Sequence, residues 1–261
     1  MSAFGEAWRA EFLAAFTFLT RLPLSRARSA IAATSLADNV MLADTVWTFP
    51  LVGVVIGAIG GIAYAIASAL ALPPLSAALI AVASTALVTG ALHEDGLADT
   101  ADGFGGGGTR EEKLEIMRDS RSGAFGVLAL IFSVGLRSVA IADIALRWHV
   151  LAALIAAHAL SRGVLPAAML RLDPARSDGL GAGAGRPKQN QVLIALVLAL
   201  AVAVLSIGLR AGLSASIAAA IVAIAIAWLA QRQIGGQTGD VLGAIEQGAE
   251  TAALLAAAAW A

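Results

Sequence analysis

Seven apolar stretches, each about as long as a membrane-crossing helix, constrain this chain more than any other feature. A helix needs ~20 mostly apolar residues to cross a bilayer, and in lipid it satisfies its own backbone hydrogen bonds. The stretches cover residues 47–71, 76–93, 124–146, 150–170, 192–209, 213–230 and 240–260. The sequence therefore predicts an all-α fold, a polytopic membrane helix bundle of about seven spans that forms a single domain over residues 1–261.

Composition agrees with this class and excludes others. The chain is 59% hydrophobic and 13% charged, with a mean hydropathy of +0.84, whereas a soluble domain carries about 25% charged residues. A net charge of −1 gives no support for nucleic-acid binding, so membrane lipid is the expected surrounding and no nucleic acid is expected. Without cysteine, thiol chemistry and cysteine-ligated metals are excluded.

The distribution of lysine and arginine predicts the orientation. With the N-terminus inside, thirteen of the 17 basic residues fall in inner loops and two, Arg147 and Arg210, fall in outer loops; Arg137 and Arg162 lie within spans. Cytoplasmic loops carry the excess of positive charge. We therefore expect an N-in topology, with residues 94–123 on the cytoplasmic side.

Residues 1–46 have a mixed character. Trp8, Phe12, Phe16 and Leu19 recur at helical spacing on one face, which favours an interfacial helix lying on the membrane; a short tilted span is the alternative. Farther along, the loop 171–191 is either a tether or a lid.

Glycines at positions 53, 57 and 61 repeat every four residues. Small residues at this spacing allow a second helix to approach closely. The partner is either another helix of this chain or a second subunit, so a homo-oligomer stays open.

Four carboxylates within nine residues follow the second apolar stretch directly, in the segment 93–103, whose sequence is HEDGLADTADG. On a helix, Asp95, Asp99 and Asp102 lie within about 60° of one another on one face, whereas Glu94 points elsewhere. Like charges on one helix face repel each other. A bound cation would compensate this repulsion; a solvated acidic loop is the structural alternative.

The residue types on this face suit Mg²⁺. Mg²⁺ takes oxygen ligands and commonly shares its coordination shell with substrate phosphates. In phosphoryl transfer, a metal neutralises charge on the transferred group, and a spare carboxylate can accept the proton of an attacking hydroxyl. We therefore expect Asp95, Asp99 and Asp102 to be metal ligands and catalytic residues of a cytoplasmic active-site loop, residues 94–123.

Basic and acidic residues elsewhere are candidate substrate ligands. Arg118 and Arg121 are one helical turn apart, and arginine suits phosphate oxygens; membrane anchoring by positive charge is the alternative. Arg162, inside a span one turn after His158, is expected to meet substrate phosphate.

A glycine-rich run, Gly235-Gly236-Gln237-Thr238-Gly239-Asp240, enters the last apolar stretch. Thr238 is placed to cap that helix, and Asp240 falls in its first turn. Capping alone explains Thr238. Asp240 is a further candidate ligand because it enters the membrane on the same side as the acidic segment.

Five segments resemble the motifs of one family in order along nearly the whole chain. They are FLTRLP at 18–23, FPLVG at 49–53, residues 93–103, RDSRSGAFG at 118–126, and residues 235–243. They are similar to those of the cobalamin synthases, or adenosylcobinamide-GDP ribazoletransferases.

This resemblance implies a reaction and a location. The family joins adenosylcobinamide-GDP, a corrinoid-GDP, to α-ribazole or its 5′-phosphate, releases GMP, requires Mg²⁺ and resides in the bacterial inner membrane. A ribose hydroxyl would then attack the cobinamide-linked phosphorus, with Asp102 a possible proton acceptor.

Two other functions remain open from sequence. CDP-alcohol phosphotransferases use an Asp-Gly-x-x-Ala-Arg motif with two later aspartates, whereas residues 95–99 read Asp-Gly-Leu-Ala-Asp, without that arginine and with tighter spacing. A cation-coupled transporter would place acids near the midplane in two similar halves. Here the acids lie at one interface, and the chain has no convincing internal repeat.

Overall fold

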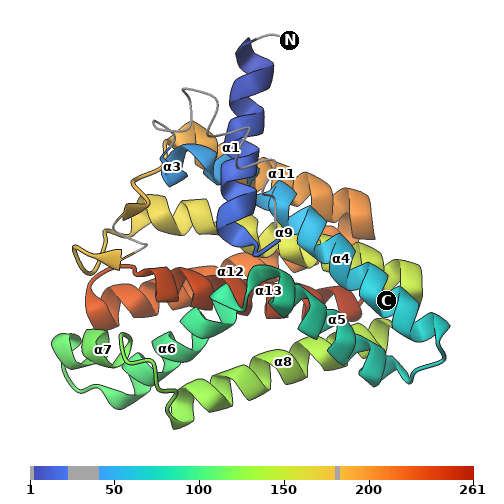
Figure 1. Ribbon diagram of the computed structural model, residues 1–261. Helices are drawn as coiled ribbons and strands as arrows, with labels where there is room; N and C mark the ends of the chain where they lie inside the picture. Colours follow the sequence, from blue (N-terminus) through green and yellow to red (C-terminus); the bar gives the residue numbers. More distant parts are fainter. Residues whose placement is uncertain (1–2, 23–40, 180–182) are drawn as a thin grey trace.

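The computed structural model describes residues 3–22, 41–179 and 183–261, and within these ranges the chain is a bundle of helices (Figure 1). The described residues contain no β-strand; one isolated parallel bridge joins Pro174 to Gln237. The predicted all-α fold is confirmed. Arg26, Arg28 and the rest of residues 23–40 lie outside the described residues, so the predicted segment 1–46 is seen only in part.

The helices follow the apolar stretches closely. In chain order they are α1 (Ala3–Leu19), α3 (Leu42–Thr45), the 3₁₀ turn η2 (Val46–Thr48), α4 (Phe49–Ala69), α5 (Pro74–Thr89), α6 (Leu92–Gly106), α7 (Arg110–Ile116), α8 (Ala124–Ile144), α9 (Arg147–Arg171), α11 (Gln189–Ile207), α12 (Leu209–Ile234) and α13 (Gly239–Ala258).

Fewer helices qualify as membrane spans than the seven that the sequence predicts. Among the described residues, five are long and apolar enough: Leu42–Ala69, α8, α9, α11 and α12. A sixth span would be the bent pair of α5 and α6. The seventh predicted stretch forms α13, which is not among these spans and carries Asp240, Glu246 and Glu250. Most of α13 is instead buried against other helices of the chain.

The second predicted span, 76–93, is broken near its end. The chain turns by 93° between α5 and α6, because Gly90 and Ala91 both adopt the left-handed conformation, with φ of 67° and 56°. Glycine takes this conformation without the steric cost that alanine has to bear. The acidic residues of 94–102 thus lie on α6, a helix of 15 residues with four carboxylates; because it is too short and too acidic to cross a bilayer by itself, we assign it to the part of the chain outside the spanning segments.

The glycine repeat of α4 packs against α9 of the same chain. A Cβ atom on Gly53 would collide with the carbonyl of His158, and one on Gly57 would lie 2.7 Å from the Cα of Ile155. A Cβ on Gly61 would meet the Cα of Leu151 at the same distance. The partner of the repeat is therefore intramolecular.

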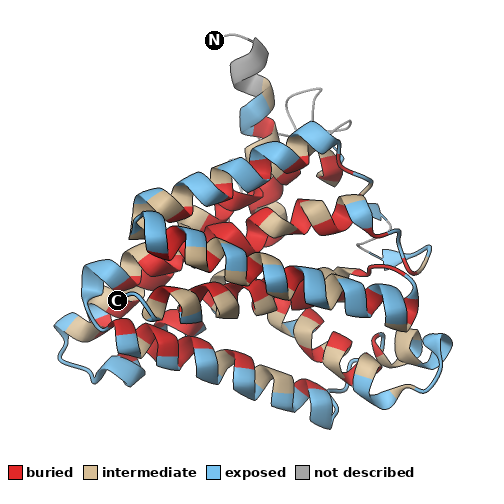
Figure 2. Ribbon diagram, turned by 180° about the vertical axis from the view of Figure 1, so that it is seen from behind, coloured by how far each residue is buried: buried red, intermediate tan, exposed pale blue. Residues whose placement is uncertain are grey.

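The outward faces of the helices are exposed (Figure 2), and many of the exposed side chains are apolar. Leucine, isoleucine and valine side chains are exposed along α8, α11 and α12, among them Ile131, Leu193, Val197, Ile217 and Ile224. Contiguous exposed apolar surface of this kind matches lipid rather than water. The fold is that of a multi-pass membrane protein.

Helix α1 runs across the direction of α4, α9 and α11 (Figure 1). It is fixed at its inner end, where Phe16 and Leu19 are buried, and Trp47 donates a hydrogen bond of 2.6 Å from its indole Nε1 to Glu11. This crossing direction supports the interfacial helix that the sequence predicts, and placement on the membrane surface stays a prediction.

The α4–α9 contact predicts a sensitivity to single methyl groups. We expect Gly57→Ala to destabilise the protein by about 1–3 kcal/mol, because the added Cβ meets backbone atoms of α9 that cannot move aside. Thermal unfolding in detergent, followed by tryptophan fluorescence, measures the change. Gly135→Ala is the matched control, since a Cβ there meets nothing within 4 Å. An unchanged midpoint for Gly57→Ala would contradict the close contact.

Candidate metal and phosphate site

The acidic face of α6 lies against the start of α13. Gly96 is the contact residue, since a Cβ on it would stand 2.9 Å from the Cα of Asp240. From the other side, a Cβ on Gly243 would stand 3.1 Å from the Cα of Gly96. Asp95 flanks this contact, and Asp99 follows one turn later. The structure thus brings together two of the three predicted α6 aspartates and Asp240, which come from segments about 140 residues apart.

The carboxylates are crowded enough to perturb one another. Burial raises the pKa of the Asp99 carboxyl to about 7, and the charges of Asp95 and Asp240 add to this effect. The guanidinium of Arg176 acts in the opposite direction. A carboxylate whose ionisation is this unfavourable, within a group of acids, is typical of a site that binds a cation.

Arg176 is a site residue that sequence reasoning missed. Its Nη2 lies 3.3 Å from Oδ2 of Asp240, and its Nε lies 3.9 Å from Oδ1 of Asp178. The hydroxyl of Thr238 also donates to Oδ2 of Asp240, at 3.1 Å, and accepts the N–H of Val241 as the predicted helix cap. The loop after α9 carries several charged residues, but its sequence does not indicate which of them reaches Asp240.

Asp102 occupies a different environment from the other two aspartates. It is buried, its Oδ2 accepts the N–H of Gly123 at 2.7 Å, and its Oδ1 accepts the N–H of Gly126 at 2.8 Å. These N–H groups belong to the N-terminus of α8, where a carboxylate satisfies unpaired donors and interacts favourably with the helix dipole. Both oxygens of Asp102 thus bind the backbone, which joins α6 to α8.

The two predicted phosphate-binding arginines are paired with acidic neighbours. Nη2 of Arg118 contacts both carboxylate oxygens of Asp178, at 2.7 and 2.8 Å. Arg121 pairs with Asp119, two residues away, and its side chain is 87% exposed. Exposed pairs of this kind contribute little stability. Both guanidiniums can therefore exchange a carboxylate partner for a phosphate at small cost.

Arg162 lies in a buried network of ion pairs within the bundle. Its side chain is 1% exposed, and its Nη1 contacts Oε1 of Glu246 at 2.6 Å. The network also contains His158, Glu250 and Arg137. Within the described part of the chain, Arg162 pairs with Glu246 and Glu250 and makes no contact with the three α6 aspartates, so its meeting with substrate phosphate stays a prediction.

His158, Glu246 and Glu250 resemble a metal site, because their ligand atoms lie within 4.8 Å of one another. A cation already occupies this position. Nη1 of Arg162 lies 2.6 Å from Glu246 and 2.9 Å from Nδ1 of His158. The guanidinium neutralises the carboxylates directly. We therefore assign these residues a structural role as a buried ion-pair network and not the binding of a metal ion.

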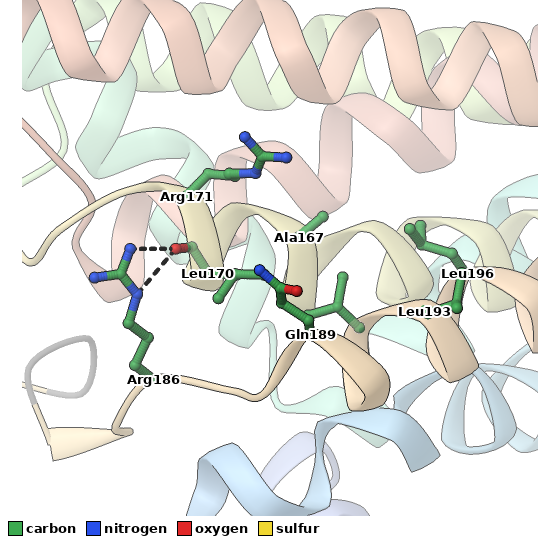
Figure 3. Close-up of a pocket in the computed structure, with 8 residues that line it drawn as sticks. Ala167, Leu170, Arg171, Arg186, Gln189, Leu193 and Leu196 are labelled. Carbon is green, nitrogen blue, oxygen red and sulfur yellow. Dashed lines mark hydrogen bonds between the residues drawn. The ribbon is translucent and has the colours of Figure 1, made fainter.

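A separate groove of about 560 Å³ lies between the end of α9 and the start of α11 (Figure 3). Nε and Nη2 of Arg186 donate to the carbonyl of Leu170, at 3.1 and 2.7 Å. These bonds satisfy a carbonyl in the last turn of α9. They tie the end of the 171–191 loop to α9, which favours the tether over the lid.

Fold and site together define a multi-pass α-helical membrane protein with a crowded carboxylate site, flanked by arginines, at the junction of α6, α13 and the loop after α9. A family model described as cobalamin-5-phosphate synthase matches residues 11–258, and the chain belongs to this family.

Three similar proteins support the assignment, and each is named adenosylcobinamide-GDP ribazoletransferase. The protein of Bradyrhizobium diazoefficiens is 50% identical over 251 residues, covering 96% of this chain and 94% of the relative. That of Mesorhizobium japonicum is 44% identical, covering 92% and 89%. That of Brucella canis is 40% identical, covering 91% and 92%. No solved structure matches the chain.

The different environments of the aspartates predict opposite effects on stability. We expect Asp102→Asn to lower the stability of the metal-free protein by about 1–2 kcal/mol, because an amide cannot accept both α8 N–H groups. Asp95→Asn should leave stability unchanged or raise it, since Asp95 is exposed and repels its neighbours. Thermal unfolding in EDTA measures both variants. Equal shifts of the unfolding midpoint in the two variants would show that Asp102 does not stabilise the fold more than Asp95 does.

Proposed function

We propose that this protein is an Mg²⁺-dependent transferase that joins adenosylcobinamide-GDP to α-ribazole, or to its 5′-phosphate, and releases GMP. The products are adenosylcobalamin or its 5′-phosphate. The observation that most directly supports this proposal is that Asp95, Asp99 and Asp240 lie close together beside Arg176. The relatives of the chain are named as enzymes of this reaction.

The carboxylates present are of the donor type that a divalent cation takes. Asp95, Asp99 and Asp240 supply hard oxygen ligands, and their mutual repulsion is only partly offset by Arg176. When bound, Mg²⁺ would neutralise negative charge on the pyrophosphate of the donor. Asp102 contributes differently from what the sequence suggested, because both its oxygens bind the start of α8.

The arginines at the rim suit the phosphates of the donor. Arg118 and Arg176 both contact Asp178, so one exposed aspartate holds two guanidiniums near the acidic face. A pyrophosphate could replace Asp178 as their partner, because planar guanidiniums bind phosphate oxygens through paired N–H groups. Arg121, fully in solvent beside Asp119, would extend the same basic rim.

The transfer itself requires one bond to form and one to break. A ribose hydroxyl oxygen of α-ribazole attacks the cobinamide-linked phosphorus, and the bond from that phosphorus to the bridging oxygen breaks, so that GMP leaves with the bridging oxygen. The hydroxyl proton passes to a carboxylate. Because Asp102 is occupied by backbone donors, Asp95 and Asp99 are the aspartates of α6 that remain for this task.

The orientation follows from the basic residues. Arg118 and Arg176 contact Asp178, and Arg176 also contacts Asp240; by the positive-inside rule, these basic residues favour the cytoplasmic side for this end of the bundle. GTP-derived donors are cytoplasmic substrates. The proposed location is the bacterial inner membrane, with the site facing the cytoplasm.

An assay with purified protein tests the proposal. With adenosylcobinamide-GDP, α-ribazole and Mg²⁺, we expect GMP release that EDTA abolishes and added Mg²⁺ restores. Asp99→Asn should lower the rate roughly 100-fold or more, because it removes a ligand and a charge from the site.

Glu111→Gln is the matched control, since Glu111 is an acidic residue of α7 with a side chain 78% exposed. It should retain the wild-type rate. Absence of GMP release from the wild-type protein, or turnover of a CDP-linked donor in its place, would overturn the proposed reaction.

A further inference from the structure

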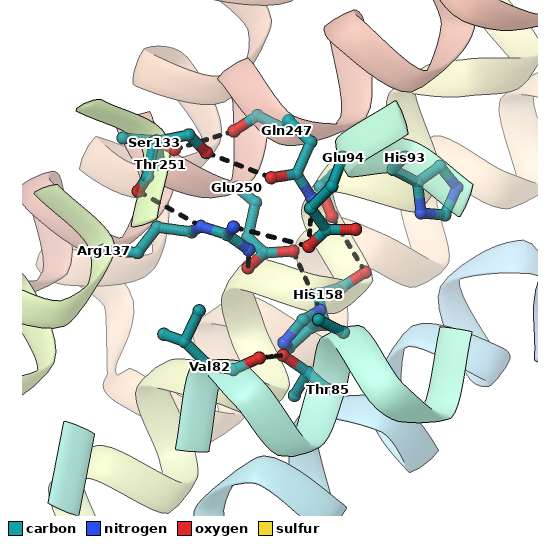
Figure 4. Close-up of polar contacts among 12 residues, drawn as sticks. Val82, Thr85, His93, Glu94, Ser133, Arg137, His158, Gln247, Glu250 and Thr251 are labelled. Carbon is teal, nitrogen blue, oxygen red and sulfur yellow. Dashed lines mark hydrogen bonds and ion pairs between the residues drawn. The ribbon is translucent and has the colours of Figure 1, made fainter. Parts of the chain in front are cut away.

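Arg137 bridges two helices from deep inside the bundle. It lies on α8, its side chain is 1% exposed, and its Nη1 contacts Oε1 of Glu250 on α13 at 2.9 Å. Its Nη2 contacts Oε1 of Glu94 on α6 at 3.4 Å. One guanidinium thus holds a carboxylate from each of the two helices that supply the acidic face (Figure 4).

A second polar side chain reinforces the same bridge. Nε2 of Gln247 on α13 donates to Oε1 of Glu94 at 3.3 Å and to Oε2 of Glu246 at 3.0 Å. Its Oε1 accepts the hydroxyl of Ser133 on α8 at 3.0 Å, one turn before Arg137. Glu94, which precedes Asp95 in the sequence, is therefore bound by side chains of both α8 and α13.

The bridge connects the two helices that carry the acidic face. Asp95 and Asp99 belong to α6, Asp240 belongs to α13, and the polypeptide connects these helices only through the intervening residues 107–238. A small shift of α6 along α13 would separate the carboxylates. Buried charges resist such a shift, because a displaced partner leaves an uncompensated charge in a medium of low polarity.

The geometry points to Arg137 as a positioning residue: we propose that it fixes the separation of Asp95 and Asp99 from Asp240, and so sets the affinity of the acidic face for a divalent cation. Arginine suits this task because its planar guanidinium presents N–H groups in two directions, whereas a lysine ammonium is a point charge that would favour one carboxylate. This inference rests on the proposed cation site.

Mn²⁺ binding to the purified protein, measured from the electron paramagnetic resonance signal of free Mn²⁺, tests the inference without turnover. We expect Arg137→Lys to weaken binding at least tenfold while keeping the helical circular dichroism of the wild type. Glu94→Gln removes only the contact between Arg137 and α6, so it should weaken Mn²⁺ binding by a smaller factor. This variant replaces Arg137→Lys as the test if Arg137→Lys does not fold.

Tyr64→Phe is the stability control. Tyr64 is buried and its hydroxyl donates to the carbonyl of Ala145 at 3.1 Å, just beyond the far end of α8, so its loss perturbs α8 packing away from the acidic face. Mn²⁺ affinity should be unchanged in this variant, even where the unfolding midpoint falls as much as in Arg137→Lys.

The outcomes separate the inference from the site on which it rests. Wild-type binding that Asp99→Asn weakens and both bridge variants leave intact would overturn the positioning by Arg137 alone. Absence of wild-type binding, or binding that Asp99→Asn does not weaken, would overturn the cation site and the inference with it. If Tyr64→Phe weakened Mn²⁺ binding as much as Arg137→Lys does, the effect would be one of general destabilisation, and the positioning by Arg137 would also be overturned.

Discussion

The backbone contact between α6 and α13 at Gly96 and Gly243 is the constraint on which the rest of the structure depends. Any side chain at Gly96 would meet the backbone of Asp240, so the absence of a Cβ allows the two helices to meet where their acidic residues begin. The bend at Gly90 and Ala91 then directs α6 along α13 instead of onward from α5. Carboxylates that are far apart in the sequence thereby become neighbours and repel one another, which a bound cation would relieve.

Beneath this contact, buried ion pairs hold the helices in place. Arg137 and Arg162 face Glu94, Glu246 and Glu250 within the bundle, where unpaired charges would be costly. Such pairs are weak evidence for stability, because desolvation offsets much of their attraction. These pairs instead select one arrangement of the helices. Hydrogen-bonded charges are satisfied in only one packing, whereas the small apolar residues around them would tolerate several.

The sequence predicted most of the fold but only part of the site. Apolar length located the helices, and the glycine repeat of α4 indicated a close partner, because both depend on local composition. The break at Gly90 was missed although a glycine is a local signal for a helix end, and the burial of α13 was missed because its tertiary partners determine it. Helical phase grouped Asp95, Asp99 and Asp102 correctly on one helix, but it could not show that the N-terminus of α8 would bind Asp102. Arg176 was missed for the same reason, because its contact with Asp240 is made across a loop.

The central claim is that α6 and α13 present one shared cation site. Because the chain has no cysteine, the pair Asp99→Cys and Asp240→Cys can be introduced without background thiols. Cd²⁺ protection of these thiols against maleimide labelling measures their shared coordination. The account predicts that the double variant is protected at a Cd²⁺ concentration at least tenfold below that needed by either single variant. Equal concentrations for the single and double variants would contradict a shared site.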